Sequence, residues 1–200
     1  MQEVHRRLYE ARPRRGPAST LASVQVRNEE ERDGEGVRAV HLAAFGDHGR
    51  VVADLVDDLR TIPGCLSLVA DDGGELAGHV MFTTSLLDTP PRLVPVQVLS
   101  PVGVLPAHQR RGVGSAMIRR GLELLEASSV PLVLLEGSPQ YFSRFGFGPG
   151  GDLGFRKPSL RIPDAAFQAL RLPAYEPWMT GTLVYSEVFW RHDAVGLRER

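Results

Sequence analysis

The sequence predicts an α/β domain built on a mixed β-sheet with helices on its faces. Segments with apolar residues at helical spacing alternate with short apolar runs that are typical of strands. Glycine and proline turns separate these segments. A chain of 200 residues with 42% hydrophobic content suits one domain with a substantial core. The predicted order of elements is βααβββαβαβ.

The elements of the first half follow from periodicity and turn residues. The helical segments carry apolar residues three and four positions apart, and the strand segments are short apolar runs. Asp71-Asp72-Gly73-Gly74 has the composition of a hairpin turn. The expected elements are a strand over 22–27, helices over 30–45 and 50–60, and strands over 66–70 and 76–87.

The second half opens with a strand that the sequence predicts to be irregular. Residues 94–104 are rich in Val and Leu but include Pro101 and Gly103. Because proline has no N–H to donate to a ladder, we expect the strand to bulge or to part from a neighbour at this point. The remaining expected elements are a helix over 112–127, a strand over 131–136, a short helix around 141–145, a small helix over 164–170 and a closing strand over 180–189.

Charge and cysteine content argue against several classes of function. The formal net charge of -1 gives no overall attraction for nucleic acid or anionic membranes. No apolar run approaches the roughly 18 residues of a membrane helix. The single cysteine, Cys65, cannot form a disulfide within the chain, so we expect a cytoplasmic protein with Cys65 packed as a small hydrophobe. The histidines show no metal-ligand spacing, and no metal is expected.

Three parts of the chain are expected. Residues 1–22 contain five arginines interrupted by Glu3 and Glu10, and we expect a flexible tail there rather than a nucleic-acid-binding arm. Residues 23–190 are expected to form the domain, and residues 191–200 a C-terminal tail. The final strand could close its own sheet or reach a neighbour's, so a homodimer stays open.

The chemistry is predicted to lie where a strand gives way to a helix. The strand ends at Val104, Pro106 turns the chain, and Gly112 and Gly114 open the helix. Glycines let backbone amides approach a ligand, and the first amides of a helix lack internal partners and lie at the positive end of its dipole. This arrangement predicts a seat for a pyrophosphate. A Walker lysine is missing, and Met117 stands where a Rossmann fingerprint has its third glycine.

On these residues the sequence resembles the GNAT N-acetyltransferase superfamily, whose cofactor motif [QR]-x-x-G-x-[GA] follows a strand ending in V-x-P. The matching residues are Val104-Leu105-Pro106 and Gln109, Gly112 and Gly114. Gly137-Ser138-Pro139, followed by Tyr-aromatic-x-Arg-Phe-Gly-Phe, is similar to the YhbS-like N-acetyltransferases. The order of segments agrees with GNAT domains over about residues 24–147.

The resemblance implies the GNAT acyl-CoA N-acyltransferase fold. That fold has a mixed, mostly antiparallel sheet with splayed central parallel strands and helices on both faces. Acetyl-CoA would lie between the splayed strands, with its thioester and pantetheine along the first strand and its pyrophosphate on the helix start. The implied cofactor-binding residues are Val102, Gly103, Val104, Gln109, Arg110, Arg111, Gly112, Val113, Gly114 and Ser115.

The implied reaction moves an acetyl group from acetyl-CoA to a primary amine by direct attack in a ternary complex. The amine would belong to a small molecule or a protein, with no nucleic acid or membrane as partner. Phe142 occupies the position of the usual GNAT acid, so Tyr141, one residue earlier, is the candidate acid. Glu136, at the end of the strand after the cofactor helix, is the first candidate base. Weaker candidates for the base are His79, Ser100 and Glu29.

An alternative function is a CoA- or acyl-CoA-binding sensor with little or no turnover. Phe142 cannot donate a proton, and no base stands out in the sequence. Direct aminolysis nevertheless gains much from positioning alone, so missing acid–base groups do not exclude an enzyme. The sequence predicts an acyltransferase with an unidentified acceptor.

Overall fold

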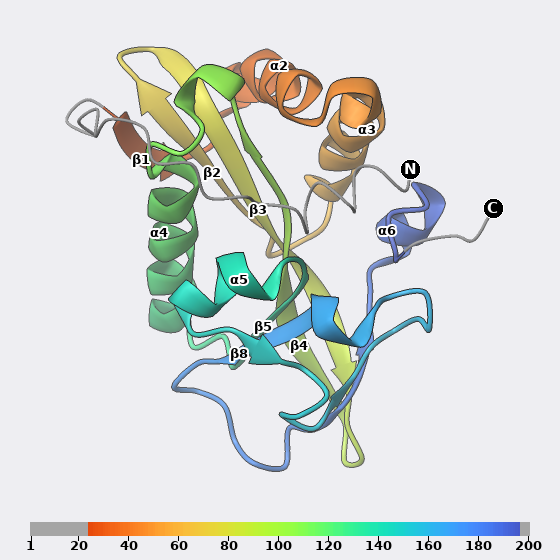
Figure 1. Cartoon of the computed structure of the whole chain (residues 1–200). Coiled ribbons are helices and arrows are strands. Elements are labelled where there is room, and N and C mark those ends of the chain that lie inside the picture. The colour runs from red at the N-terminus through yellow and green to blue at the C-terminus, as the bar shows by residue number, and fades with distance from the viewer. Residues whose placement is uncertain (1–23, 197–200) are drawn as a thin grey trace. The chain divides into compact units, whose positions relative to one another are not determined.

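The computed structural model describes residues 24–196, which contain one nine-stranded sheet and several helices (Figure 1). The strands are arranged in the order β1-β2-β3-β4-β5-β8-β6, while β9 pairs with both β3 and β7. The β4–β5 and β7–β9 pairs are parallel, and the β1–β2, β2–β3, β3–β9, β5–β8 and β6–β8 pairs are antiparallel. This confirms the predicted mixed, mostly antiparallel sheet. The predicted N-terminal tail lies outside the described residues.

The described chain divides into two compact units. The N-terminal unit contains residues 24–83 and 100–124, and the C-terminal unit contains residues 84–99 and 125–196. The elements that pass from one unit to the other are β3 (Glu75–Asp88), β4 (Leu93–Val104) and α4 (Val113–Ala127).

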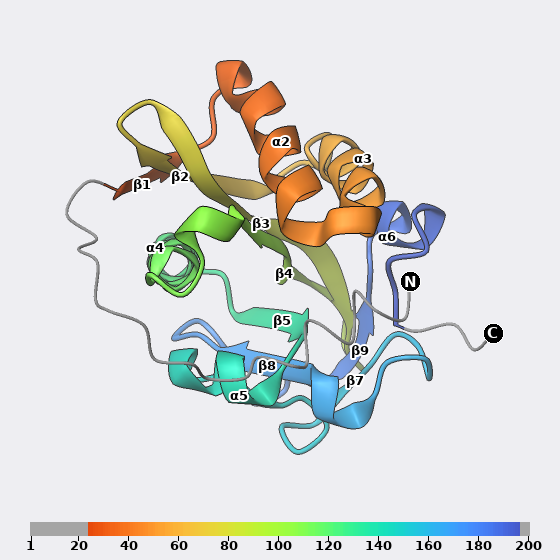
Figure 2. The same ribbon diagram turned by 45° about the horizontal axis from the view of Figure 1, so that its top comes forward.

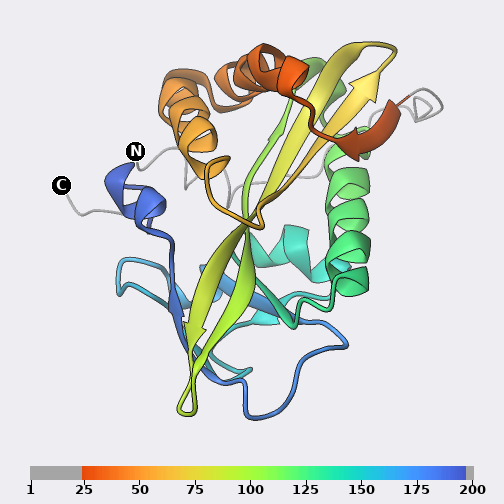
Figure 3. The same cartoon turned by 180° about the vertical axis from the view of Figure 1, so that it is seen from behind.

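The N-terminal unit is an antiparallel meander with helices on both faces. β1 (Val24–Asn28) pairs with β2 (Leu66–Asp72), and β2 pairs with β3. Figures 2 and 3 show α2 (Gly34–Phe45) and α3 (Gly49–Leu59) on one face of these strands and α4 on the other. The helices and hairpin therefore lie close to the ranges that periodicity predicts. The core of this unit includes the fully buried side chains of Val37, Val56, Leu59, Leu68, Val80 and Phe82.

Two glycines in the strands lie where helices pack closely against the two faces of the sheet. A Cβ placed on Gly78 of β3 would lie 2.8 Å from the Cε of Met117 on α4. A Cβ placed on Gly103 of β4 would lie 2.9 Å from Nδ1 of His41 on α2. Because side chains alternate along a strand, His79 projects to the face opposite Gly78, where its ring meets that of His41.

In the C-terminal unit, β5 (Leu132–Glu136) lies between β4 and β8 (Phe167–Arg171). The parallel ladder with β4 joins Gln97 to Val133 and Val98 to Leu134. Pro101 does not end β4, which continues to Val104 through a cis Ser100–Pro101 peptide bond. The other elements of this unit are α5 (Pro139–Phe142), β6 (Gly148–Pro149), β7 (Phe155–Arg156), β9 (Gly181–Val184) and α6 (Glu187–Arg191).

Two predictions for the C-terminal part are wrong. The helix predicted over 164–170 is a short 3-10 turn, Asp164–Ala166, followed by β8, because β5 offers this segment a five-residue antiparallel ladder. The strand predicted over 180–189 ends at Val184. Ser186 instead caps α6, accepting a hydrogen bond from the N–H of Val188 at 3.4 Å.

Cys65 packs as the sequence predicts. Its Sγ donates a hydrogen bond to the carbonyl oxygen of Phe82 at 3.2 Å and lies 3.7 Å from Oγ1 of Thr83. Burial raises the pKa of the Cys65 thiol to about 11. The thiol is therefore neutral near pH 7 and is a poor nucleophile.

None of the helices within residues 24–196 is both long enough and apolar enough to cross a bilayer.

The close approach of β9 to β3 gives a test of the packing in the C-terminal unit. A Cβ on Gly181 would lie 1.9 Å from the carbonyl oxygen of Asp88. We expect Gly181→Ala to lower the free energy of unfolding, measured by urea denaturation, by about 1–3 kcal/mol. Gly151→Ala is the matched control, since its Cβ would meet nothing within 4 Å. Equal stability of the two variants would contradict this packing.

Candidate active site

The loop between β4 and α4 is tied to the end of the strand. The Nε2 of Gln109 donates a hydrogen bond to the carbonyl oxygen of Val104 at 3.0 Å. Two residues of the loop have left-handed backbone conformations, Arg110 with φ of 61° and Gly112 with φ of 90°. Glycine adopts this conformation without a steric penalty, which explains the first glycine of the motif. Gln109 and Gly112 thus fix how the chain turns from the strand into the helix.

The first turn of α4 presents backbone N–H groups that the helix itself does not use. The helix begins at Val113, and the N–H of Ala116 donates to the carbonyl oxygen of Gly112 at 2.9 Å. The N–H groups of Val113, Gly114 and Ser115 precede this bond and have no acceptor within the helix. They lie at the positive end of the helix dipole, where an anion is stabilised.

The end of β4 carries the predicted thioester-binding residues. Val102 and Val104 are half-buried, and Gly103 between them is buried. The side of Gly103 on which a side chain would lie faces α2, where Nδ1 of His41 and Cγ1 of Val40 are 2.9 and 3.3 Å from the ideal Cβ position. Ser100, a weaker candidate for the base, is half-buried and precedes the cis bond.

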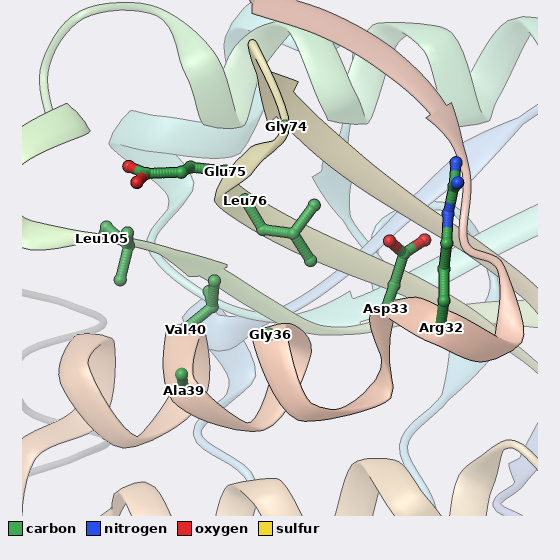
Figure 4. Close-up of a pocket in the computed structure, with 9 residues that line it drawn as sticks. All are labelled: Arg32, Asp33, Gly36, Ala39, Val40, Gly74, Glu75, Leu76 and Leu105. Atoms are coloured by element: carbon green, nitrogen blue, oxygen red, sulfur yellow. The ribbon is translucent and has the colours of Figure 1, made fainter.

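A groove of about 390 Å³ runs beside α2 in the N-terminal unit (Figure 4). Figure 4 shows α2 along one side of it, with Leu76 from the β2–β3 hairpin pointing toward the helix and Glu75 pointing to the left. Leu105, which directly follows β4, lines this groove, and so does Val40, whose Cγ1 is 3.3 Å from the ideal Cβ position of Gly103. Its full lining is Arg32, Asp33, Gly36, Ala39, Val40, Gly74, Glu75, Leu76 and Leu105.

Tyr141 and Phe142 lie in an aromatic cluster of the C-terminal unit. Phe142 is nearly buried and packs against Phe147, with ring centroids 6.0 Å apart. Tyr141 is half-buried, and the Arg144 guanidinium lies 4.8 Å from its ring centroid. The preceding Ser138 is the N-cap residue of α5. Its hydroxyl bonds to the side chain of Gln140 at 2.8 Å and not to a helix N–H.

Glu136 is held by hydrogen bonds within the C-terminal unit. Its Oε1 accepts from the hydroxyl of Tyr185 at 2.9 Å, and its Oε2 accepts from the N–H of Gly196 at 3.2 Å. Val195, next to Gly196, is fully buried. The carboxylate thus anchors the segment after α6, in the range where the sequence predicts a tail.

The N-terminal unit contains a chain of hydrogen bonds, with two buried histidines, that no spacing in the sequence indicates. Nε2 of His41 lies 2.8 Å from Nδ1 of His79, and Nε2 of His79 lies 2.7 Å from Oγ of Ser67. Ser67 in turn donates to Oε2 of Glu29, and Nε of Arg60 donates to Oε1 of Glu29 at 2.8 Å. Both imidazole rings are fully buried. We call these residues, from His41 to Glu29, the histidine chain.

The histidine chain was visible in the sequence only in part. The sequence indicates His79 and Glu29 as weaker candidates for the base, whereas His41 falls on the apolar face of the helix predicted over 30–45. The signal that could have found it is a histidine on the buried face of a helix, since such a ring needs a polar partner.

The environment sets the charge of each member of the histidine chain. Burial lowers the pKa of His79, and burial together with the nearby His79 and Arg60 holds the pKa of His41 well below its ordinary value. Burial alone would raise the pKa of Glu29, but hydrogen bonds from His79, Arg60 and Ser67 outweigh it and lower this pKa to about 2. Near pH 7 the chain therefore consists of two neutral imidazoles and one carboxylate.

These pKa directions predict acid sensitivity of the fold. Below pH 6.5 the unfolded chain binds protons on His41 and His79 that the native state does not, so the free energy of unfolding falls. Each histidine contributes a slope of at most about 1.4 kcal/mol per pH unit. The ionised Glu29 carboxylate adds to the free energy of unfolding above pH 4.5, and this stabilisation is lost as the pH falls from 4.5 to about 2.

Urea denaturation at several pH values between 7.5 and 4 measures this dependence. His41→Gln should reduce the slope just below pH 6.5, because glutamine binds no proton in the unfolded chain. A wild-type stability that is constant between pH 6.5 and 5 would contradict neutral buried histidines.

Known proteins resemble this chain in sequence and in structure. The uncharacterized N-acetyltransferase YjhQ of Escherichia coli K12 is 34% identical over 129 residues, which are 63% of this chain and 71% of YjhQ. The structure of YhbS from Escherichia coli in complex with CoA covers 90% of this chain and 97% of its own, with a TM-score of 0.75 and 28% identity. A GNAT family acetyltransferase from Brucella melitensis in complex with acetyl-CoA covers 83% of this chain and 97% of its own, with a TM-score of 0.67 and 30% identity.

The acetyltransferase (GNAT) domain family matches residues 25–150, which is more than half of the chain. The matched range includes both the strand end at Val104-Leu105-Pro106 and the glycine pair. This protein belongs to the GNAT acetyltransferase family.

Proposed function

We propose that this protein transfers an acetyl group from acetyl-CoA to a primary amine of a small molecule or a protein, by direct attack in a ternary complex. The observation that carries the proposal is the start of α4, where Val113, Gly114 and Ser115 offer N–H groups without helical acceptors. The relatives crystallised with CoA and acetyl-CoA support the same cosubstrate here.

The pyrophosphate of CoA would bind the first turn of α4. The dipole of a 15-residue helix and its unused N–H groups favour an anion there. Arg110 and Arg111 are exposed beside it and could add charge-assisted hydrogen bonds. Gln109 would act indirectly, by holding the loop to Val104.

The pantetheine and thioester would lie along Val102, Gly103 and Val104. The parallel ladder of β4 includes Gln97 and Val98, which precede this segment. A backbone N–H of the segment would polarise the thioester oxygen in the manner of an oxyanion hole. The amine would attack the carbon of the polarised carbonyl.

Tyr141 and Glu136 stay the sequence-based candidates for acid and base. Tyr141 is half-buried, so its hydroxyl is a possible proton donor to the departing thiolate. Glu136 is a weaker candidate in the folded chain, because both of its oxygens accept hydrogen bonds from Tyr185 and Gly196. A cytoplasmic location and a homodimer stay predictions from the sequence.

A CoA-binding sensor with little turnover is the second candidate. Two observations favour it, the burial of Phe142 at the usual position of the acid and the engagement of Glu136 in structural hydrogen bonds. The two functions share the cofactor seat and differ only in turnover.

Release of free thiol separates the enzyme from the sensor. Purified protein with acetyl-CoA and a panel of amines, including lysine, spermidine and a peptide with a free N-terminus, should release CoA thiol with at least one acceptor. Acetyl-CoA alone is the control for hydrolysis. Tight binding of acetyl-CoA with no release above this control for any acceptor would favour the sensor.

Gly114 provides a test of the pyrophosphate seat. We expect Gly114→Leu to raise the Kd for CoA by roughly 10- to 100-fold, because a side chain here blocks hydrogen bonds to a charged group worth about 1.5–3 kcal/mol. Isothermal calorimetry measures the change. Leucine favours a helix more than glycine does, so the fold should persist.

The matched control is Gly34→Leu in the first turn of α2, where a Cβ meets nothing within 4 Å. This variant should bind CoA as the wild type does. Unchanged CoA affinity in Gly114→Leu would contradict the proposed seat.

A further inference from the structure

We propose that His41 is the catalytic proton acceptor of the acetyl transfer, and that His79, Ser67 and Glu29 form the buried chain that orients it. This inference rests on the proposed function, since it needs the thioester to lie at Gly103. It assigns to His41 a role that does not follow from the glycine motif.

The ionised carboxylate of Glu29 fixes the direction of the hydrogen bonds. A carboxylate only accepts, so the single hydroxyl proton of Ser67 is donated to Oε2 of Glu29. The Ser67 oxygen then has no proton left for His79 and must accept one from it. The short contact of 2.7 Å between Oγ of Ser67 and Nε2 of His79 therefore places the His79 proton on Nε2.

The same reasoning continues to His41. A neutral imidazole carries one proton, so Nδ1 of His79 has a lone pair and accepts from Nε2 of His41 at 2.8 Å. His41 then carries its proton on Nε2 and a lone pair on Nδ1. That nitrogen is buried and has no hydrogen-bond partner among residues 24–196. An unsatisfied buried acceptor is destabilising, so a ligand or water is expected to complete it.

The unpartnered nitrogen is next to the proposed thioester-binding strand. It lies 2.9 Å from the position where Gly103 would carry a Cβ, so only glycine lets the ring approach the strand this closely. The ring is further fixed by stacking on Phe45, with centroids 5.7 Å apart. Val40, whose Cγ1 lies 3.3 Å from the same Cβ position, and Leu105, directly after β4, both line the groove beside α2, so we expect the amine to approach the end of β4 from this groove.

The charges around His41 allow it to gain and return a proton. The charged and titratable groups of the surrounding elements are His79 on β3, Glu29 after β1 and Arg60 at the end of α3. Burial and Arg60 keep the ring neutral at rest, with its pKa below the ordinary value. The carboxylate of Glu29, 3.5 Å from Nε2 of His79, stabilises a positive charge that reaches His79.

Bonds and protons balance when the histidine chain takes up and returns the proton of the amine. The amine nitrogen bonds to the thioester carbon, and the C–S bond breaks with its electron pair on sulfur. One proton leaves the nitrogen through a bridging water to Nδ1 of His41, while the proton on Nε2 moves to Nδ1 of His79. The reverse movement returns one proton from His41 to the thiolate, so that His41 takes the place of the sequence-based candidate Tyr141 as the acid. The products are the amide and the CoA thiol; an amine that enters as an ammonium ion gives its extra proton to solvent.

His41→Gln tests the role of His41 as proton acceptor. The amide is similar in size but cannot take up a proton near pH 7. With the amine that gives thiol release in the wild type, we expect turnover to fall by at least ~100-fold, the range of a lost general base. The KM for acetyl-CoA and the Kd for CoA should stay within about twofold of the wild-type values, because His41 is not proposed to hold the cosubstrate in the ground state. His48→Gln is the matched control and should keep wild-type turnover.

Glu29→Gln tests the positioning role of the chain. Without the carboxylate, an imidazolium at His79 is less stable, so the acidic limb of the turnover-against-pH profile should move to lower pH. A residue that only supported the fold would lower turnover without moving this limb. An unmoved limb in a folded Glu29→Gln variant would therefore overturn the positioning role.

The outcomes separate this inference from the proposed function. A folded His41→Gln variant that binds CoA and keeps wild-type turnover overturns the inference and leaves the acetyltransferase proposal intact. A wild-type protein that does not bind CoA overturns the acetyltransferase proposal first.

Nitrogen-15 NMR of the histidine rings tests the role of His41 even if no amine in the panel is acetylated. It should show an unprotonated Nδ1 on His41 whose resonance shifts with acetyl-CoA, whereas a protonated Nδ1, or one that does not respond, overturns the inference.

Discussion

The histidine chain, which ends at the carboxylate of Glu29, is the constraint on which the N-terminal unit depends. It joins the end of β1 to β2, β3 and α2, and Arg60 links it to the end of α3. Because the carboxylate can only accept, every proton in the chain is directed toward it. The consequence at the far end is a buried nitrogen on His41 that can accept a proton and faces Gly103.

Much of the fold could be predicted because local patterns and tertiary structure agree through residue 145. Apolar periodicity, the Asp71–Gly74 turn, and Gly112 and Gly114 at the start of α4 each determine a local conformation that the sheet then uses. The family could be predicted from the segment between β4 and α4. The left-handed conformation of Gly112 and the N–H groups without helical acceptors in the first turn of α4 are local consequences of the sequence.

The rest could not be predicted because it depends on residues that are distant in sequence. Phe167–Arg171 has apolar residues compatible with either a helix or a strand, and only its ladder with β5 selects the strand. The predicted closing strand failed because a single capping residue, Ser186, starts a helix. The histidine chain combines residues from four separate segments of the sequence, and Glu136 gains its partner Gly196 from 60 positions away. No spacing rule in a single sequence brings such residues together.

We propose that the acetyl-CoA thioester lies at Gly103, within reach of the proton-accepting nitrogen of His41. A crystal structure of the protein with bound acetyl-CoA is the decisive test. We expect the pyrophosphate on the amides of the first turn of α4, the acetyl carbonyl beside Gly103, and an ordered water bonded to Nδ1 of His41. A thioester bound elsewhere, with Nδ1 of His41 facing only protein atoms, would contradict it.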